Sequence, residues 1–290
     1  MARPDSLTAP EVPAPRDVSG AEADVAAAGR PAVPPVVRRL DDLTSWRPAA
    51  AAAVAACSDD ASSAADVAAA VSADPALASR LLRTANSAYF GQSGRVADLG
   101  RAVSVVGVRG VQAMAAAALA SAGDGEPPPG WWARSVTTAS AGRVLAVRFG
   151  VPAAEAFAAG LLADVGVALL HAHDPVAWAA VAVEVEDLDD AERLEREAEV
   201  FGIDHVDLAR RLGEVVVLPG RMVEGFAQHH DREASTPLGR LLCTAVAIVE
   251  DRDDDDVAER SGGLLDADEV DVVREDAEQR AEVLSAVLGG

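Results

Sequence analysis

Residues 74–91 read DPALASRLLRTANSAYFG, and this stretch decides the fold class. An aspartate accepts hydrogen bonds from the first N–H groups of a helix, and proline suits the first helical position, so Asp74 followed by Pro75 predicts a helix start. Three leucines then form one apolar face at positions i, i+4 and i+5 (Leu77, Leu81 and Leu82). The pattern predicts an amphipathic helix that begins at Pro75 and ends near Ser87.

The rest of the chain has the same character. Half of its 290 residues are hydrophobic but only 3% are aromatic, so alanine, valine and leucine must fill the core, and alanine and leucine favour helices. Only the trio 215–217 resembles a strand. The fold class predicted from these patterns is all-α, with further helices expected at 98–107, 153–159, 160–170, 188–201, 205–212, 219–230 and 237–249.

Changes in composition predict the domain boundaries. Residues 1–38 are rich in proline and alanine without a sustained period, which is typical of a disordered tail. The run GDGEPPPG at 123–130 separates two helical halves, 39–122 and 131–249. Residues 250–290 form an acidic extension with spaced valines and leucines, which we expect to be partly helical.

The charge of the chain excludes several functions. Lys plus Arg number 25 against 47 Asp plus Glu, for a net charge of −22, and no lysine is present. Schiff-base and P-loop mechanisms both need a lysine amine and are therefore excluded. Most of the negative charge falls in an expected acidic surface helix within 184–204 and in 250–290, and no basic helix exists elsewhere. Nucleic-acid binding is not expected, because it depends on neutralising phosphates.

Targeting and cysteine patterns predict a cytoplasmic protein. The first thirty residues lack an apolar signal-peptide core, and no membrane-spanning run is apparent, so we expect no membrane partner. Cys57 and Cys243 are isolated, without metal-ligand spacing. We expect both to be free, buried thiols in a reducing compartment.

Two polar positions inside apolar helices stand out as candidates for binding. Asn86, with Arg83 one turn earlier, could end its helix as a cap or could contact a ligand. Asp164 lies in the apolar run GLLADVG at 160–166 and needs a partner if it is buried. A metal ion, an arginine or a helix N-terminus would each satisfy that need.

Three histidines could complete a metal site with Asp164. His205, His229 and His230 supply imidazole nitrogens, and an aspartate with three histidines is a sufficient ligand set for a divalent ion. However, adjacent residues on a helix point about 100° apart, so His229 and His230 would diverge. The spacing alone leaves a metal site and ordinary buried histidines both open.

Six segments together resemble the HDOD family, the HD-related output domains of bacterial signalling proteins. They follow the family order over about residues 40–249: DPALASRLLRTANSAYFG (74–91), RAVSVVGVRGVQAM (101–114), WWARS (131–135), EAFAAGLLADVG (155–166), FGIDHVDLA (201–209) and QHH (228–230). The resemblance implies an all-helical domain related to the metal-dependent HD phosphohydrolases, with an additional N-terminal helical half.

The same resemblance shows that three expected metal ligands are replaced. The position of the first histidine matches Arg134, the His-Asp pair that names the superfamily is Ala163-Asp164, and the closing aspartate matches Val246. Asp164, His205, His229 and His230 remain as remnant ligand positions. Because a guanidinium stays protonated and repels a divalent ion, we expect an Arg134–Asp164 ion pair, no metal, no cofactor and no catalysis.

Two functions follow from this resemblance. The first is a non-catalytic bacterial regulatory module that binds a partner protein or a small anionic signalling ligand and transmits binding through the packing of its two halves. Its expected ligand cleft combines Arg83, Asn86, Arg134, Asp164 and His229. The alternative is a diverged metal-dependent phosphohydrolase that acts on a nucleotide or cyclic dinucleotide, with Asp164 and the three histidines as a reduced metal site.

Overall fold

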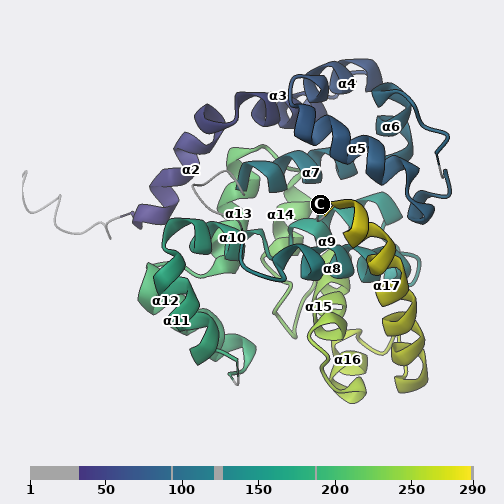
Figure 1. The fold of residues 1–290 in the computed structure, drawn as a ribbon. Coiled ribbons are helices and arrows are strands. Elements are labelled where there is room, and N and C mark those ends of the chain that lie inside the picture. The colour runs from purple at the N-terminus through teal and green to yellow at the C-terminus, as the bar shows by residue number, and fades with distance from the viewer. Residues whose placement is uncertain (1–32, 93, 121–126, 187, 289–290) are drawn as a thin grey trace, which may run out of the picture. The chain divides into compact units, whose positions relative to one another are not determined.

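The computed structural model describes residues 33–92, 94–120, 127–186 and 188–288 of the chain (Figure 1). Within these ranges the fold is all-α and contains no strand, as predicted. The helices are α2 (Pro35–Trp46), α3 (Pro48–Ser58), α4 (Ala64–Ser72), α5 (Pro75–Asn86), the short 3-10 helix η1 (Ala88–Phe90), α6 (Leu99–Val106), α7 (Val108–Ala120), α8 (Trp131–Leu145), α9 (Ala153–Leu162), α10 (Val165–His173), α11 (Pro175–Glu184), α12 (Asp190–Phe201), α13 (His205–Val215), α14 (Gly220–Phe226), α15 (Pro237–Val249), α16 (Asp254–Arg260) and α17 (Ala267–Leu288).

Aspartate or threonine followed by proline starts three of these helices. The Asp74 carboxylate accepts from the backbone N–H groups of Ala76 and Leu77, both at 3.0 Å, and begins α5 as predicted. Asp174 caps α11 and Thr236 caps α15 in the same way. The α11 helix was not predicted, although its cap signal is as clear as that of α5.

Small residues let α8 and α9 pack almost backbone to backbone at the centre of the fold. A Cβ added to Gly160 would lie 2.8 Å from the Cα of Ala139 on α8, closer than real Cβ contacts allow. A Cβ on Gly142 would lie 3.0 Å from the backbone oxygen of Ala156 on α9. The alanine-rich composition is therefore explained by close helix packing rather than by exposed helices.

Helices α3 to α7 form the N-terminal half, drawn in blue and blue-teal in Figure 1. Within it, α4, α5 and α6 pack on one another, and α7 joins this half to α9. Every residue of α7 from Gly110 to Ala120 is buried, which makes it a core helix. Cys57 on α3 and Cys243 on α15 are buried free thiols, as predicted.

The two ends of the chain compare differently with the predicted boundaries. Helix α2 begins at Pro35, inside the range predicted as a disordered tail, while residues 1–32 lie outside the described residues. At the other end, residues 250–288 contain the helices α16 and α17, in line with the expected partly helical segment, and α17 packs on α8, α15 and α5. Its apolar stripe is buried at Val270, Val273, Ala277, Ala281 and Leu284.

Two apolar features of the sequence resolve into core elements. Residues 153–173 are long and apolar enough to cross a membrane, but 89% of the tested window is buried inside the fold, as in the core helices of soluble proteins. Helices α6 and α7 are long and apolar enough to cross a membrane only if they are taken together, and the chain bends by 101° between them. The strand-like trio 215–217 is not a strand: Val215 ends α13, Val216 is its C-cap, and Val217 lies in the following turn with a positive φ of 54°.

Candidate functional site

Asp164 lies at a break between two buried helices. Helix α9 ends at Leu162 and α10 begins at Val165, so Asp164 occupies the N-cap position, yet its side chain makes no capping bond. Its backbone oxygen accepts a hydrogen bond from Trp131 Nε1 at 2.9 Å, which ties the break to α8. The residue is 3% exposed, so the carboxylate is directed into the protein.

His205 reaches Asp164 because a glycine on α10 leaves room for the start of α13. A Cβ on Gly166 would lie 1.9 Å from the His205 backbone oxygen, so only glycine permits this approach. The His205 Nδ1 lies 2.6 Å from a carboxylate oxygen of Glu197. In the tautomer that donates Nδ1–H to that carboxylate, the ring has its Nε2 lone pair toward Asp164, 3.9 Å from Oδ1.

His229 and His230 follow α14 in a turn, not on a helix, so the expected divergence of the two rings does not apply. His229 Nδ1 lies 2.6 Å from the backbone oxygen of Phe226, and its Nε2 lies 3.5 Å from Asp164 Oδ1. The ring centroids of His229 and His230 are 4.3 Å apart. His230 Nδ1 is in turn 3.2 Å from an Asp190 carboxylate oxygen.

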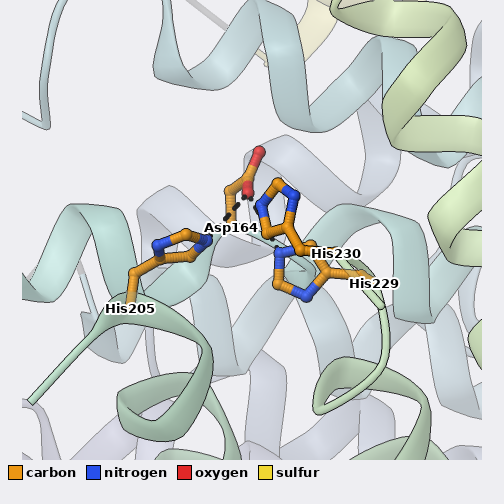
Figure 2. Close-up of side chains that lie close together, drawn as sticks. All are labelled: Asp164, His205, His229 and His230. Atoms are coloured by element: carbon orange, nitrogen blue, oxygen red, sulfur yellow. Dashed lines mark ion pairs between the residues drawn. The ribbon is translucent and has the colours of Figure 1, made fainter. Parts of the chain in front are cut away.

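Together these four side chains form a cluster with the donors of a metal site (Figure 2). One ligand atom from each of Asp164, His205, His229 and His230 lies within 4.8 Å of the others, and all four residues are buried. Asp164 Oδ1 and the Nε2 atoms of all three histidines have no hydrogen-bond partner. Buried polar atoms are rarely left unpaired, so this cluster, which we call the histidine cluster, fits a divalent ion.

Burial and neighbouring side chains shift the pKa values of His230, Glu197 and Asp164. Burial, reinforced by His229, lowers the pKa of His230 to about 4, so its ring is neutral at pH 7. Burial alone would raise the pKa of Glu197, but His205 and Arg193 outweigh it and lower that pKa to about 2. For Asp164, His229 and His205 likewise outweigh burial and hold the pKa below its usual value. When bound, such an ion would act as a Lewis acid and lower the pKa of a coordinated water.

Asp164 lines the first of two adjoining cavities. The first, the Asp164 cavity, has a volume of about 350 Å³ and is walled by Trp131, Trp178 and Pro129. The second, the arginine cavity, has a volume of about 630 Å³. Both are lined by Arg134 and Arg193. Of the histidine cluster only Asp164 lines either cavity among the described residues, so the three imidazoles lie behind it.

The predicted Arg134–Asp164 ion pair is wrong. Arg134 Nη1 instead pairs with Glu250 Oε1 at 3.4 Å, and no arginine lies within 4.0 Å of Asp164 in the described part of the chain. The two side chains line the same cavity, and the Arg134 charge contributes to lowering the pKa of Asp164 without contact. The sequence could not predict that Glu250 is the partner of Arg134, because the two residues are 116 positions apart in the chain.

The expected cleft that joined Arg83 and Asn86 to Asp164 is not formed by the structure. The Asn86 amide donates to Val96 O at 2.7 Å and accepts from Val96 N at 2.9 Å, fixing the loop before α6. Arg83 is exposed on α5, and neither residue lines the two cavities beside Asp164. Asn86 is the last residue of α5 and Ser87 is its C-cap, but the Asn86 side chain does bind backbone groups at the helix end, with a bond to Leu82 O at 3.0 Å. Arg134, Asp164 and His229, in contrast, do lie in one region.

Sequence reasoning missed a second polar cluster next to the histidines, which we call the ion-pair cluster. Its carboxylates are Asp190 and Glu250, and its cations are Arg193, Arg252 and Arg260. Helix α12 was expected to be a surface helix, yet the Glu197 side chain on it is fully buried and the Arg193 side chain is 14% exposed. The (i, i+4) spacing of Arg193 and Glu197 is equally typical of an exposed helix face, so the local sequence carries no signal of this buried role.

The structure is an all-helical domain in which a buried aspartate at a helix break lies close to three histidines, as the resemblance to HD-related domains implies. The chain belongs to the HDOD domain family, whose model matches residues 43–232. No curated protein matches the chain.

Solved structures share this fold. A "Putative phosphohydrolase" from Shewanella amazonensis SB2B superposes with a TM-score of 0.65 at 22% identity, covering 87% of this chain and 98% of its own. A "Putative signal transduction protein" from Marinobacter aquaeolei VT8 gives 0.64 at 20% identity, covering 94% and 66%. An HDOD domain protein from Geobacter sulfurreducens gives 0.58 at 21% identity, covering 91% and 95%. At these identities the likeness concerns the fold.

Proposed function

We propose that this chain is a non-catalytic signal-transduction module that binds a small anionic signalling ligand in the two cavities beside Asp164. The observation that carries the proposal is the position of Arg134. It lines both cavities at the point where the resemblance places the first metal ligand of the hydrolases. Its guanidinium is permanently cationic and favours an anion over a metal-bound water at that place.

The access to the histidine cluster supports the same proposal. A hydrolytic metal site keeps an open coordination position that faces its substrate. Here the three imidazoles lie behind Asp164 and do not line the cavities. Three arginines (Arg134, Arg193 and Arg252) line the cavities together with the carboxylates of Asp164, Glu186, Glu250 and Asp251. A ligand there would contact guanidiniums and would not reach the imidazoles, which favours binding over hydrolysis. A regulatory role, a partner protein that reads the bound state, and a cytoplasmic location are parts of this proposal.

The test is a hydrolysis assay matched by a metal analysis. Purified protein is supplied with Mn²⁺, Fe²⁺ or Zn²⁺ and assayed on a phosphodiester and cyclic-dinucleotide panel. We expect no turnover above that of Asp164→Asn. Metal-dependent turnover that is lost in Asp164→Asn but kept in Asp207→Asn, an exposed control, would overturn the proposal.

A metal-dependent phosphohydrolase is the second candidate, and one observation favours it. The histidine cluster has four ligand atoms gathered within 4.8 Å, with unpaired lone pairs. This candidate requires about one equivalent of tightly bound metal in the purified protein, lost in His229→Ala, together with turnover. Metal without turnover would instead make the ion a structural element of the regulatory module.

A further inference from the structure

Glu250 occupies the place where three arginines from different helices and turns converge. Its Oε1 accepts from Arg134 Nη1 at 3.4 Å and from Arg193 Nη1 at 3.0 Å. Its Oε2 accepts from Arg252 Nη2 at 3.2 Å. The carboxylate side chain is only 13% exposed and lines the arginine cavity. Three guanidiniums around one carboxylate form an anion site that a residue of the chain itself fills.

Two of these arginines would keep their positions without Glu250. Arg193 is also held by Glu197 at 3.4 Å, and Arg252 by Asp190 at 2.9 Å. Arg134 has Glu250 as its one ion-pair partner in the described part of the chain. An anion that replaces Glu250 would therefore find Arg193 and Arg252 already held in place. Arg134 would need a new ion-pair partner, which the anion supplies. Because two of the three guanidiniums are already ordered, the free-energy cost of binding is reduced.

The chemistry of the two cavities defines the anion. A phosphate monoester offers three acceptor oxygens and more charge than a carboxylate, so it can engage three guanidiniums at once. The adjoining Asp164 cavity is walled by Trp131, Trp178 and Pro129, which suit a flat apolar group. Asp164 at its inner end repels a second anionic group. The cavities therefore suit one phosphate joined to a planar apolar body.

Building on the proposed function, we infer that Glu250 is an internal competitor that fills the arginine cavity until a phosphomonoester with a planar apolar body displaces it. The phosphate then contacts Arg134, Arg193 and Arg252, and the body enters the Asp164 cavity. Because Glu250 directly follows α15 and precedes α16, its displacement changes the chain at the start of the C-terminal helices.

The test uses phenyl phosphate as the probe and calorimetric titration of the full chain. Glu250→Gln removes the competitor, and we expect it to bind phenyl phosphate about tenfold more tightly than the original protein. Glu186→Gln is the matched control: Glu186 lines the same cavity, is exposed, and makes no ion pair within the described residues. It removes the same charge, and we expect its affinity to stay within about twofold of the original.

Other measurements complete the test. Equal gains in Glu250→Gln and Glu186→Gln would show a general charge effect and overturn the inference, as would no binding by any of the three proteins. Inorganic phosphate should bind at least about fivefold more weakly than phenyl phosphate, and equal affinities would overturn the role of the Asp164 cavity. If Glu250→Gln fails to fold by circular dichroism, Glu250→Asp, with its retracted carboxylate, should show an intermediate gain; no gain would overturn the inference. Failure here leaves the proposed function standing, because that depends on the hydrolysis assay.

Discussion

The histidine cluster and the ion-pair cluster lie side by side, yet they differ in what completes them. Both gather three or more metal-type ligands within 4.8 Å, the second through Asp190, His230 and Glu250. In the ion-pair cluster Arg252 and Arg260 contact Asp190 at 2.9 and 2.8 Å, so its carboxylates are satisfied by the chain. In the histidine cluster the lone pairs remain unpaired. A candidate metal site is therefore distinguished from an ion-pair network by buried lone pairs that lack a hydrogen-bond partner. The closeness of the ligand atoms alone does not distinguish the two.

The largest expected effect comes from separating His205 from Asp164. In Gly166→Ala the new Cβ would collide with the His205 backbone oxygen, so α10 and α13 must move apart. We expect a loss of about 4 kcal/mol in the free energy of unfolding, measured in urea, together with loss of any metal binding. Gly220→Ala, where a Cβ meets nothing within 4 Å, is the control and should change stability by less than about 1 kcal/mol. Equal effects at the two glycines would contradict the close approach.

The next effect tests whether the ion-pair cluster depends on all its members. Asp190→Asn removes the charge that Arg252, Arg260 and His230 share, and Arg260 is 4% exposed. We expect a cost of about 3 kcal/mol in urea unfolding, because a buried guanidinium loses a partner. Asp207→Asn, in an exposed pair with Arg210, should cost less than about 1 kcal/mol. A similar cost for both variants would mean that burial does not matter here.

His230, which belongs to both groups of close ligand atoms, should make the free energy of unfolding depend on pH. His230 has a pKa of about 4 in the folded protein, against an ordinary histidine value of 6.5 in the unfolded chain. Between about pH 6.5 and pH 4, His230 binds a proton in the unfolded chain but stays neutral in the folded protein. The free energy of unfolding therefore falls as the pH drops from about 6.5 to about 4. The full difference is roughly 3 kcal/mol. Urea unfolding in a chelator at several pH values measures it, and His230→Gln should flatten the slope; an unchanged slope in that variant would assign it to other groups.

The smallest effect on stability is expected for Arg134, an exposed arginine that pairs with Glu250 of the ion-pair cluster. Arg134 is 44% exposed and meets Glu250 at 3.4 Å, so Arg134→Gln should cost less than about 1 kcal/mol in stability. The same variant should nevertheless weaken phenyl phosphate binding. A stability loss above about 2 kcal/mol would indicate a buried ion pair, such as the contact with Asp164 predicted from the sequence.

The sequence predicts helix starts well because the signals are local. Asp74–Pro75, Asp98 and Pro237 each begin a helix at the expected residue, since capping involves atoms within one turn. The resemblance also placed Asp164 and the three histidines correctly in one region. What the sequence could not supply were partners from distant segments, because Glu250 and Arg134 meet through tertiary packing alone.

Helix α17 constrains how a bound ligand can influence the rest of the protein. It packs on α8 and α15 in one half and on α5 and η1 in the other, and its apolar stripe is buried (Figure 1). Hinge opening between the halves would expose several of these side chains, at about 1.5–3 kcal/mol for each large one. Small rearrangements around the α15–α16 turn cost far less. For the regulatory module proposed above, the output should therefore be sought as a change in local surface shape near residues 250–253, not as a change in the angle between the two halves.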